Sequence, residues 1–242
     1  MTSEPIDLRG ALGGPFDDVN RRVLQQTTAL LGSTIAFTPE NWAEPAGVPG
    51  WTKAHVAGHL VQDALRSRHV VARIAQWRGP DDLGTDDERR DELEAITASG
   101  PLDLQIALDT SAGQAAQALH DLPAALRDQT VHLPGITTTI ALLPLARLSE
   151  VVVHHLDLVD GFTLNDIDDE TALWCLEWRA SLLVGRRDLP ATRVIAEEGF
   201  DLTIGRPGSP TIARADVRTL LGWVTGRGEA PPDARWREIP LH

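Results

Sequence analysis

The chain has 242 residues, and its 35 acidic and 22 basic side chains give a net charge of −13 at pH 7. This length favours one domain followed by a smaller one, and the negative charge argues against nucleic acid or an anionic membrane as a partner, because both bind clustered lysine and arginine. With Cys175 as the single cysteine, neither an internal disulfide nor a cysteine-rich zinc site can form, and no apolar run is long enough to span a membrane. The N-terminal residues lack the pattern of a signal peptide, so we expect a cytoplasmic protein.

Helical periodicity dominates the N-terminal part of the chain. Apolar residues recur at helical spacing over 15–31, whereas the prolines and glycines over 34–50 predict a loop. A second helix is predicted to begin after Thr52, a favourable N-cap residue, and to end near residue 77, before Gly79-Pro80.

The helical pattern continues to residue 160 with one interruption. An acidic, solvent-exposed helix is compatible with the sequence from Thr85 onward. The third long helix is predicted over 102–120, and a short one follows over 123–128. Residues 130–140 contain proline, glycine and three consecutive threonines, so they predict a loop or an extended crossover. The fourth long helix is predicted over 143–160, and it holds most of the candidate chemistry.

The composition changes after residue 166. A helix is predicted over 169–183, and a last helix over 215–225. Between them lie three short strand-like runs, separated by glycine and proline, over 192–196, 201–204 and 211–213. We therefore predict an α+β protein with a four-helix domain over 1–166 and a small α/β domain over 167–242.

Two pairs of side chains have the spacing of metal ligands. His55 and His59 lie four residues apart on the second predicted helix, and Glu150 and His154 lie four residues apart on the fourth. This spacing places two side chains on one helix face, about 5–6 Å apart at Cβ, and helix bundles bind metals through such inward-facing residues. Hydrogen-bonded core residues are the alternative interpretation of either pair. Glu150 lies in an otherwise apolar helix, where a carboxylate is costly unless it is paired or bound to a metal.

Three segments together resemble one protein family. They are PGWTKAHVAGHL at 49–60, RLSEVVVHHLDL at 147–158 and GWVTGRG at 222–228. The first two are similar to the helix-opening and second motifs of the mycothiol-dependent maleylpyruvate isomerase family, a branch of the DinB-like superfamily, and the third is similar to the closing segment of that family. The first two motifs are shared across the superfamily, so they indicate a metal site more specifically than a substrate.

The resemblance implies a fold, a metal site and one catalytic residue. The fold is an N-terminal DinB-like four-helix bundle that holds a divalent metal, most often zinc, followed by a small α/β domain. The implied ligands are His59, Glu150 and His154, with Glu150 where many DinB-like proteins have a third histidine. His55 then lies next to the ligands or faces the helix. Arg227 corresponds to an arginine that reaches the active site from the small domain.

The implied reaction is the mycothiol-dependent isomerisation of maleylpyruvate to fumarylpyruvate in gentisate-type aromatic degradation. A zinc-bound thiolate would add to the cis double bond, and elimination after rotation would return the thiol. Cys175 is interpreted as a small buried side chain, so the thiol is expected to be mycothiol. The expected partners are this low-molecular-weight thiol and a small anionic substrate, whose carboxylate Arg227 would bind. The chain is expected to be a monomer or a weak homo-oligomer.

Three other residues are candidates for supporting roles. Asp157 and Asp63 are placed to orient a histidine ligand, and Arg147 is placed to pair with the glutamate or with polar groups of the thiol. A plain salt bridge is the alternative for each of these three. The sequence indicates no specific role for His155.

The same residues are compatible with three other functions. A mycothiol-dependent S-transferase would use the same metal and thiol but would form a conjugate and consume the thiol stoichiometrically. A non-enzymatic binding protein would hold a structural metal and bind an apolar ligand in the small domain, which in this family resembles a sterol-carrier fold. A helical scaffold would retain no metal.

Overall fold

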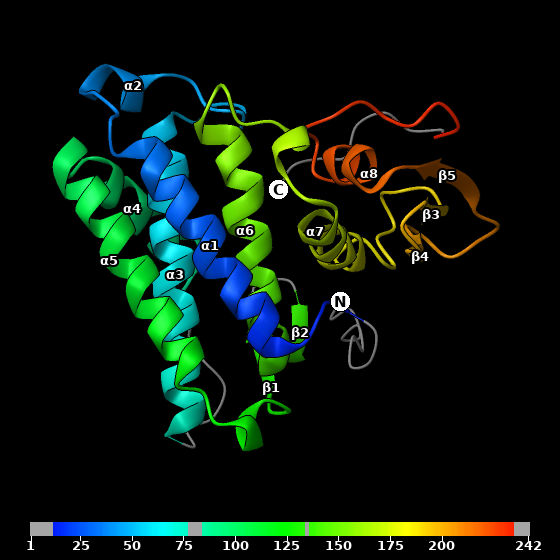
Figure 1. Ribbon diagram of the computed structural model, residues 1–242, viewed down its shortest axis with the longest axis horizontal. Helices are drawn as coiled ribbons and strands as arrows, with labels where there is room; N and C mark the ends of the chain where they lie inside the picture. Colours follow the sequence, from blue (N-terminus) through cyan, green and yellow to red (C-terminus); the bar gives the residue numbers. More distant parts are fainter. Residues whose placement is uncertain (1–11, 77–83, 134–135, 235–242) are drawn as a thin grey trace.

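The computed structural model describes residues 12–76, 84–133 and 136–234 (Figure 1). The helix stop predicted at Gly79-Pro80 lies outside these ranges. Among the described residues, no helix combines the length and the apolar character that crossing a membrane requires.

Four long helices form a bundle and bury apolar side chains between them. They are α1 (Phe16–Thr34), α3 (Lys53–Ala75), α5 (Pro101–His120) and α6 (Leu143–Leu158). α3 packs against α5 and α6, and α1 packs against the same two helices (Figure 1). A further helix, α4 (Asp86–Thr97), packs against α3 outside the bundle. The helical spacing of apolar residues therefore predicted all four long helices, because each buries one apolar face against two neighbours.

The segment predicted as a loop over 34–50 contains a one-turn helix, α2 (Pro39–Ala43). The side chain of Thr38 accepts a hydrogen bond from Asn41 N at 3.3 Å, and Asn41 Oδ1 accepts one from Thr38 N at 3.0 Å. This reciprocal capping, with proline at the first helical position, explains why a turn of helix forms in a proline-rich segment.

The segment predicted as a loop or extended crossover over 130–140 forms a β-hairpin. β1 (Thr130–Leu133) pairs antiparallel with β2 (Ile136–Thr139), with Thr130 opposite Thr139. The β-branched residues of this segment favour strands, which accounts for the hairpin. One-turn 3₁₀ helices flank it, η1 (Ala124–Leu126) before and η2 (Ile140–Leu142) after, so the short helix predicted over 123–128 is a single turn.

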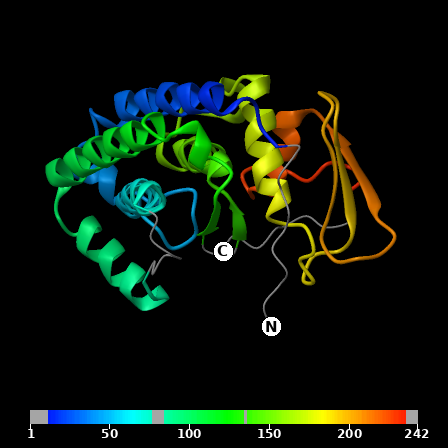
Figure 2. The same ribbon diagram turned by 90° about the horizontal axis from the view of Figure 1, so that it is seen from below.

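The C-terminal part is a three-stranded sheet packed on two helices. Its strands are β3 (Thr192–Ala196), β4 (Asp201–Ile204) and β5 (Thr211–Ala215). β3 lies in the middle, antiparallel to β4 and parallel to β5. The helices α7 (Asp169–Ser181) and α8 (Val217–Val224) follow aspartate N-caps and lie between the bundle and the sheet (Figure 2). The α+β fold class is thus confirmed.

An apolar core runs without a break from the bundle into the C-terminal part. It joins Leu148 and Val152 of α6 to Trp174 and Trp178 of α7, and it continues into the sheet. The predicted division after residue 166 coincides with the one-turn helix η3 (Leu164–Asp166). The two-domain division itself stays a prediction, since the core crosses that point.

Candidate metal centre

Three side chains from α3 and α6 converge inside the bundle. The Nε2 atoms of His59 and His154 each lie 3.2 Å from Oε2 of Glu150. The ligand atoms of the three residues lie within 4.8 Å of one another. Glu150 and His154 share one face of α6 because they are four residues apart, and this face packs against α3 where His59 lies.

The start of α3 places His55 away from this cluster. The N–H of Thr52 donates to Nδ1 of His55 at 3.2 Å, and Nε2 of His55 lies 3.8 Å from Oε1 of Glu94 in α4. Of the two positions expected for His55, the structure shows the one that faces the helix. The ring of Trp51 lies beside His59 instead, with ring centres 5.7 Å apart.

Asp157 connects the cluster to Arg227. Its Oδ2 lies 2.8 Å from Nδ1 of His154, and Arg227 donates from Nε to Oδ1 at 3.0 Å and from Nη2 to Oδ2 at 2.6 Å. The carboxylate is fully buried, so its charge depends on these partners. Because Asp157 accepts the proton of Nδ1, it leaves Nε2 of His154 as the nitrogen able to bind a metal.

The loop before α3 is attached to the end of α6 beside the same carboxylate. Gly47 N donates to the carbonyl oxygen of Asp157 at 3.3 Å, and a Cβ at residue 47 would collide with Oδ1 of Asp157. Lys53, the only lysine, is buried and donates to Glu44 at 2.7 Å and to Asp160 at 3.1 Å. The buried lysine and the side-chain-free position at 47 together keep this loop close to the cluster.

Arg179 of α7 holds the second oxygen of Glu150. Its Nη2 donates to Oε1 of Glu150 at 3.1 Å, and its Nε donates to Oγ of Ser149 at 2.6 Å. Arg179 could not be identified from the sequence motifs, because its contact joins two helices and no motif includes it. Its spacing of four residues from the buried Cys175 is the signal that places it on the inward face of α7.

Neighbouring charges keep the two carboxylates of the site ionised. Burial favours the neutral form of Glu150, but the charge of Arg179 and the hydrogen bonds to the two histidines outweigh it and hold its pKa well below 4.5. Burial is likewise outweighed at Asp157, where His154 and Arg227 lower the pKa. Burial acts to lower the pKa of His154, but the hydrogen bonds to Asp157 and Glu150 outweigh it, and the pKa is raised overall. Protons therefore compete with a cation for this ring.

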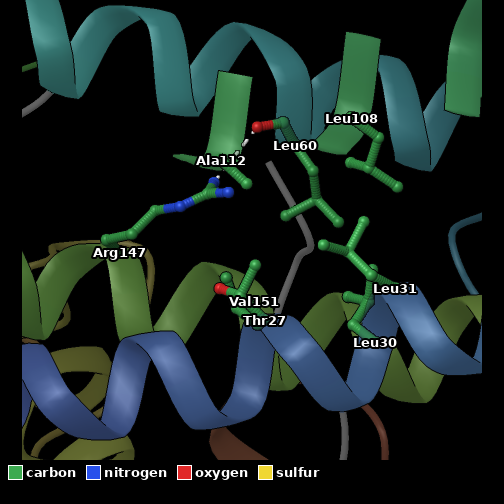
Figure 3. A pocket seen from close by; sticks show the side chains of 8 residues that line it. All are labelled: Thr27, Leu30, Leu31, Leu60, Leu108, Ala112, Arg147 and Val151. Atoms are coloured by element: carbon green, nitrogen blue, oxygen red, sulfur yellow. Dashed lines mark hydrogen bonds between the residues drawn. The ribbon is translucent and has the colours of Figure 1, made fainter. Parts of the chain in front are cut away.

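Arg147 pairs with α3, not with Glu150. Its Nη1 donates to the carbonyl oxygen of Leu60 at 3.1 Å and to Oδ2 of Asp63 at 2.8 Å. Figure 3 shows the guanidinium directed at Leu60, beside a small cavity lined mostly by apolar side chains of the bundle helices. The salt-bridge interpretation of Arg147 and Asp63 is the one that the structure shows. The bridge joins α3 to α6 next to His59.

His155 faces α1, away from the cluster. Its Nε2 lies 3.1 Å from Oγ of Ser33, and its ring stacks on Phe162 with ring centres 3.8 Å apart. Burial lowers the pKa of His155 to about 4, so the ring is neutral at pH 7. His155 is a buried packing residue between two bundle helices.

Cys175 is expected to be unreactive in the folded protein. Its side chain is fully buried, and burial raises the pKa of the thiol to about 12. Because the thiolate is the reactive form, dithiobis(nitrobenzoate) at pH 8 is expected to release no chromophore from the native protein and one equivalent per chain after denaturation. Rapid reaction of the native protein would contradict this burial.

The donor set fits a divalent cation. Two imidazole nitrogens and a carboxylate oxygen that face one point are typical ligands of a zinc site that keeps a fourth position open. The hydrogen bond from Nδ1 of His154 to Asp157 is the outer contact that a metal-binding histidine requires. A carboxylate must also be deprotonated to bind a metal, and Glu150 is ionised.

The fold and this cluster define a class of protein: a four-helix bundle with a candidate metal centre in its interior, completed by arginines from a small α/β part. Residues 23–159 match the family model described as the mycothiol maleylpyruvate isomerase N-terminal domain. The chain belongs to the mycothiol maleylpyruvate isomerase family.

Two solved structures have the same fold. They are the mycothiol-dependent maleylpyruvate isomerase and a single-residue mutant described under the same name, with TM-scores of 0.77 and sequence identities of 16% and 15%. In each case the similarity covers 92% of this chain and 98% of the other. A search of curated proteins found no match.

Proposed function

We propose that this protein catalyses the mycothiol-dependent isomerisation of maleylpyruvate to fumarylpyruvate, a step in gentisate-type aromatic degradation. The observation that carries the proposal is the cluster of His59, Glu150 and His154, with Arg227 held beside it through Asp157. Membership of the family supports it. The two solved structures of the same fold are of mycothiol-dependent maleylpyruvate isomerase.

The three clustered side chains are the proposed ligands of a divalent metal, and we favour zinc because it prefers this donor set. When bound there, zinc lowers the pKa of a thiol and stabilises the thiolate, which is the nucleophile. The protein's own contribution is to orient the donors. Asp157 orients the ring of His154, and Arg179 holds the outer oxygen of Glu150.

The reactive thiol is supplied from outside the chain. Cys175, the only cysteine, is fully buried and has a thiol pKa of about 12. Reversible addition of mycothiol to the cis double bond of maleylpyruvate leaves a single bond at that position. Rotation about this bond and elimination give the trans isomer and return the thiol.

Arg227 is the proposed binding residue for the anionic substrate. Its described contacts use Nε and Nη2 on Asp157 and Nη1 on the carbonyl oxygen of Thr225. A guanidinium has five N–H groups, so these contacts leave two for a substrate carboxylate. The buried Asp157 fixes the plane of the guanidinium, so these donors are oriented before the substrate arrives.

The charges around the cluster favour an anionic thiol and substrate. Glu150 and Asp157 carry one negative charge each, and Arg179 and Arg227 carry one positive charge each. The four charges cancel, so a divalent cation at the cluster leaves a net charge of two positive units in a largely buried site. This local positive charge attracts anions in a chain whose net charge is −13.

The zinc-loaded protein is expected to isomerise maleylpyruvate with a catalytic amount of mycothiol, and to be inactive without the thiol or after chelation. Arg227→Lys is expected to lower kcat/KM by about 100-fold to 1,000-fold, because lysine lacks the planar pair of donors. Arg218→Lys is the matched control, since Arg218 forms an ion pair with Asp169 in the same C-terminal part. Circular dichroism checks that each variant is folded.

Three results would contradict the proposal. Turnover at the full rate without thiol would show that mycothiol is not required for the reaction. Consumption of one thiol per product would identify an S-transferase. Loss of thermal stability on chelation, with no thiol-dependent turnover, would identify a binding protein with a structural metal.

A further inference from the structure

The two oxygens of Glu150 have different partners. Oε2 lies 3.2 Å from Nε2 of both His59 and His154, whereas Oε1 accepts a hydrogen bond from Nη2 of Arg179 at 3.1 Å. Only one oxygen of the carboxylate is therefore directed at the point where the two imidazoles meet. The second is bound to a positive charge on another helix.

Arg179 is itself held at a fixed position. Its Nε donates to Oγ of Ser149 at 2.6 Å, and Ser149 is fully buried on α6, next to Glu150 in the chain. The guanidinium thus contacts two consecutive residues of α6 from the last turn of α7. A planar group bound at two points cannot rotate away from Glu150 without breaking both hydrogen bonds.

We propose that Arg179 is a positioning residue that restricts Glu150 to one-oxygen coordination of the metal. This inference rests on the proposed metal centre and extends it. A carboxylate is able to bind a cation through one or both oxygens, and two-oxygen binding would occupy a coordination position in addition to those of the two histidines. By engaging Oε1, Arg179 keeps that position free for a thiol.

The same contact gives the C-terminal part a direct role at the metal centre. Glu150 is held by Arg179 of α7, and His154 is held by Asp157, which is bound to Arg227 after α8. The two ligands on α6 are thus each oriented by an arginine from beyond residue 166, one directly and one through a carboxylate.

Visible absorption of the cobalt-loaded protein tests the proposal, because four-coordinate Co²⁺ absorbs more strongly and at longer wavelength than five-coordinate Co²⁺. The unmodified protein and Arg179→Lys, which keeps a charged donor, are expected to give the intense four-coordinate spectrum. Arg179→Met and Arg179→Gln are expected to lose most of this intensity and to shift to shorter wavelength, because Oε1 is then free to bind the metal. The two neutral variants differ in size, so the test does not depend on the folding of one of them.

Arg218→Met is the matched control, because Arg218 donates to the Ile167 carbonyl oxygen and pairs with Asp169 in the same part of the protein, away from Glu150. It is expected to keep the four-coordinate spectrum. An unchanged spectrum in both neutral variants of Arg179 would overturn the role of Arg179 and leave the metal centre intact. An equal loss in Arg218→Met would also overturn it. Failure of the unmodified protein to bind cobalt would overturn the metal centre and this inference together.

Discussion

His59→Ala is expected to abolish metal binding and thiol-dependent turnover while leaving the fold intact. Alanine removes one of three donors, and a loss of more than about 100-fold in zinc affinity is expected, because substitution of an outer contact alone costs about 10-fold to 100-fold. The side chain of His59 is 29% exposed, and circular dichroism checks that the variant remains folded. Metal content after dialysis, zinc titration and the isomerisation assay measure the effect.

The matched control is His69→Ala, which removes an exposed histidine from the same helix. Its zinc content and turnover are expected to equal those of the unmodified protein. One metal ion retained per chain by His59→Ala, with normal turnover, would show that His59 is not a ligand.

Arg147→Met is expected to cause the largest loss of stability among single substitutions near the site. The arginine is 3% exposed, and its removal leaves Asp63 and the Leu60 carbonyl oxygen without their buried donor. Breaking such a pair is expected to lower the free energy of unfolding by about 3 kcal/mol, which corresponds to about 6–12 °C in Tm. Thermal and urea denaturation followed by circular dichroism measure this change.

Arg21→Met is a suitable control, because Arg21 forms an exposed ion pair with Asp18. Its effect is expected to stay within about 0.5 kcal/mol. The double variant Arg147→Met with Asp63→Asn is expected to recover part of the lost stability, because the carboxylate that keeps only the 4.0 Å contact with Arg66 is then gone. If Arg147→Met were as stable as Arg21→Met, the bridge between α3 and α6 would contribute nothing.

Most of the fold could be predicted from the sequence because its elements bury apolar faces at regular spacing. This holds for the four bundle helices and for the strands β3, β4 and β5. The helix α2 and the hairpin of β1 and β2 were missed. Both are short and depend on local hydrogen bonds, such as the one between Thr38 and Asn41. The proline and glycine in these segments are typical of loops, so the composition alone predicts a loop.

The candidate site could be predicted only in part. Spacing paired Glu150 with His154 and His55 with His59, and the family resemblance selected His59 over His55. The structure brings His59, Glu150 and His154 together, and their role as ligands stays a prediction. The contacts of Arg179 with Glu150 and of Arg227 with Asp157 could not be predicted. Each joins residues at least 29 positions apart, and such proximity follows from helix packing, which a local pattern does not contain.

The apolar core that crosses residue 166 limits how this architecture can evolve by recombination. Trp174 and Trp178 pack against Leu148 and Val152 of the bundle. A C-terminal part transferred onto a foreign bundle would leave these indole rings in water unless the recipient helix carried a matching face. The C-terminal part is therefore expected to be transferable only to a bundle whose sixth helix offers a matching apolar face.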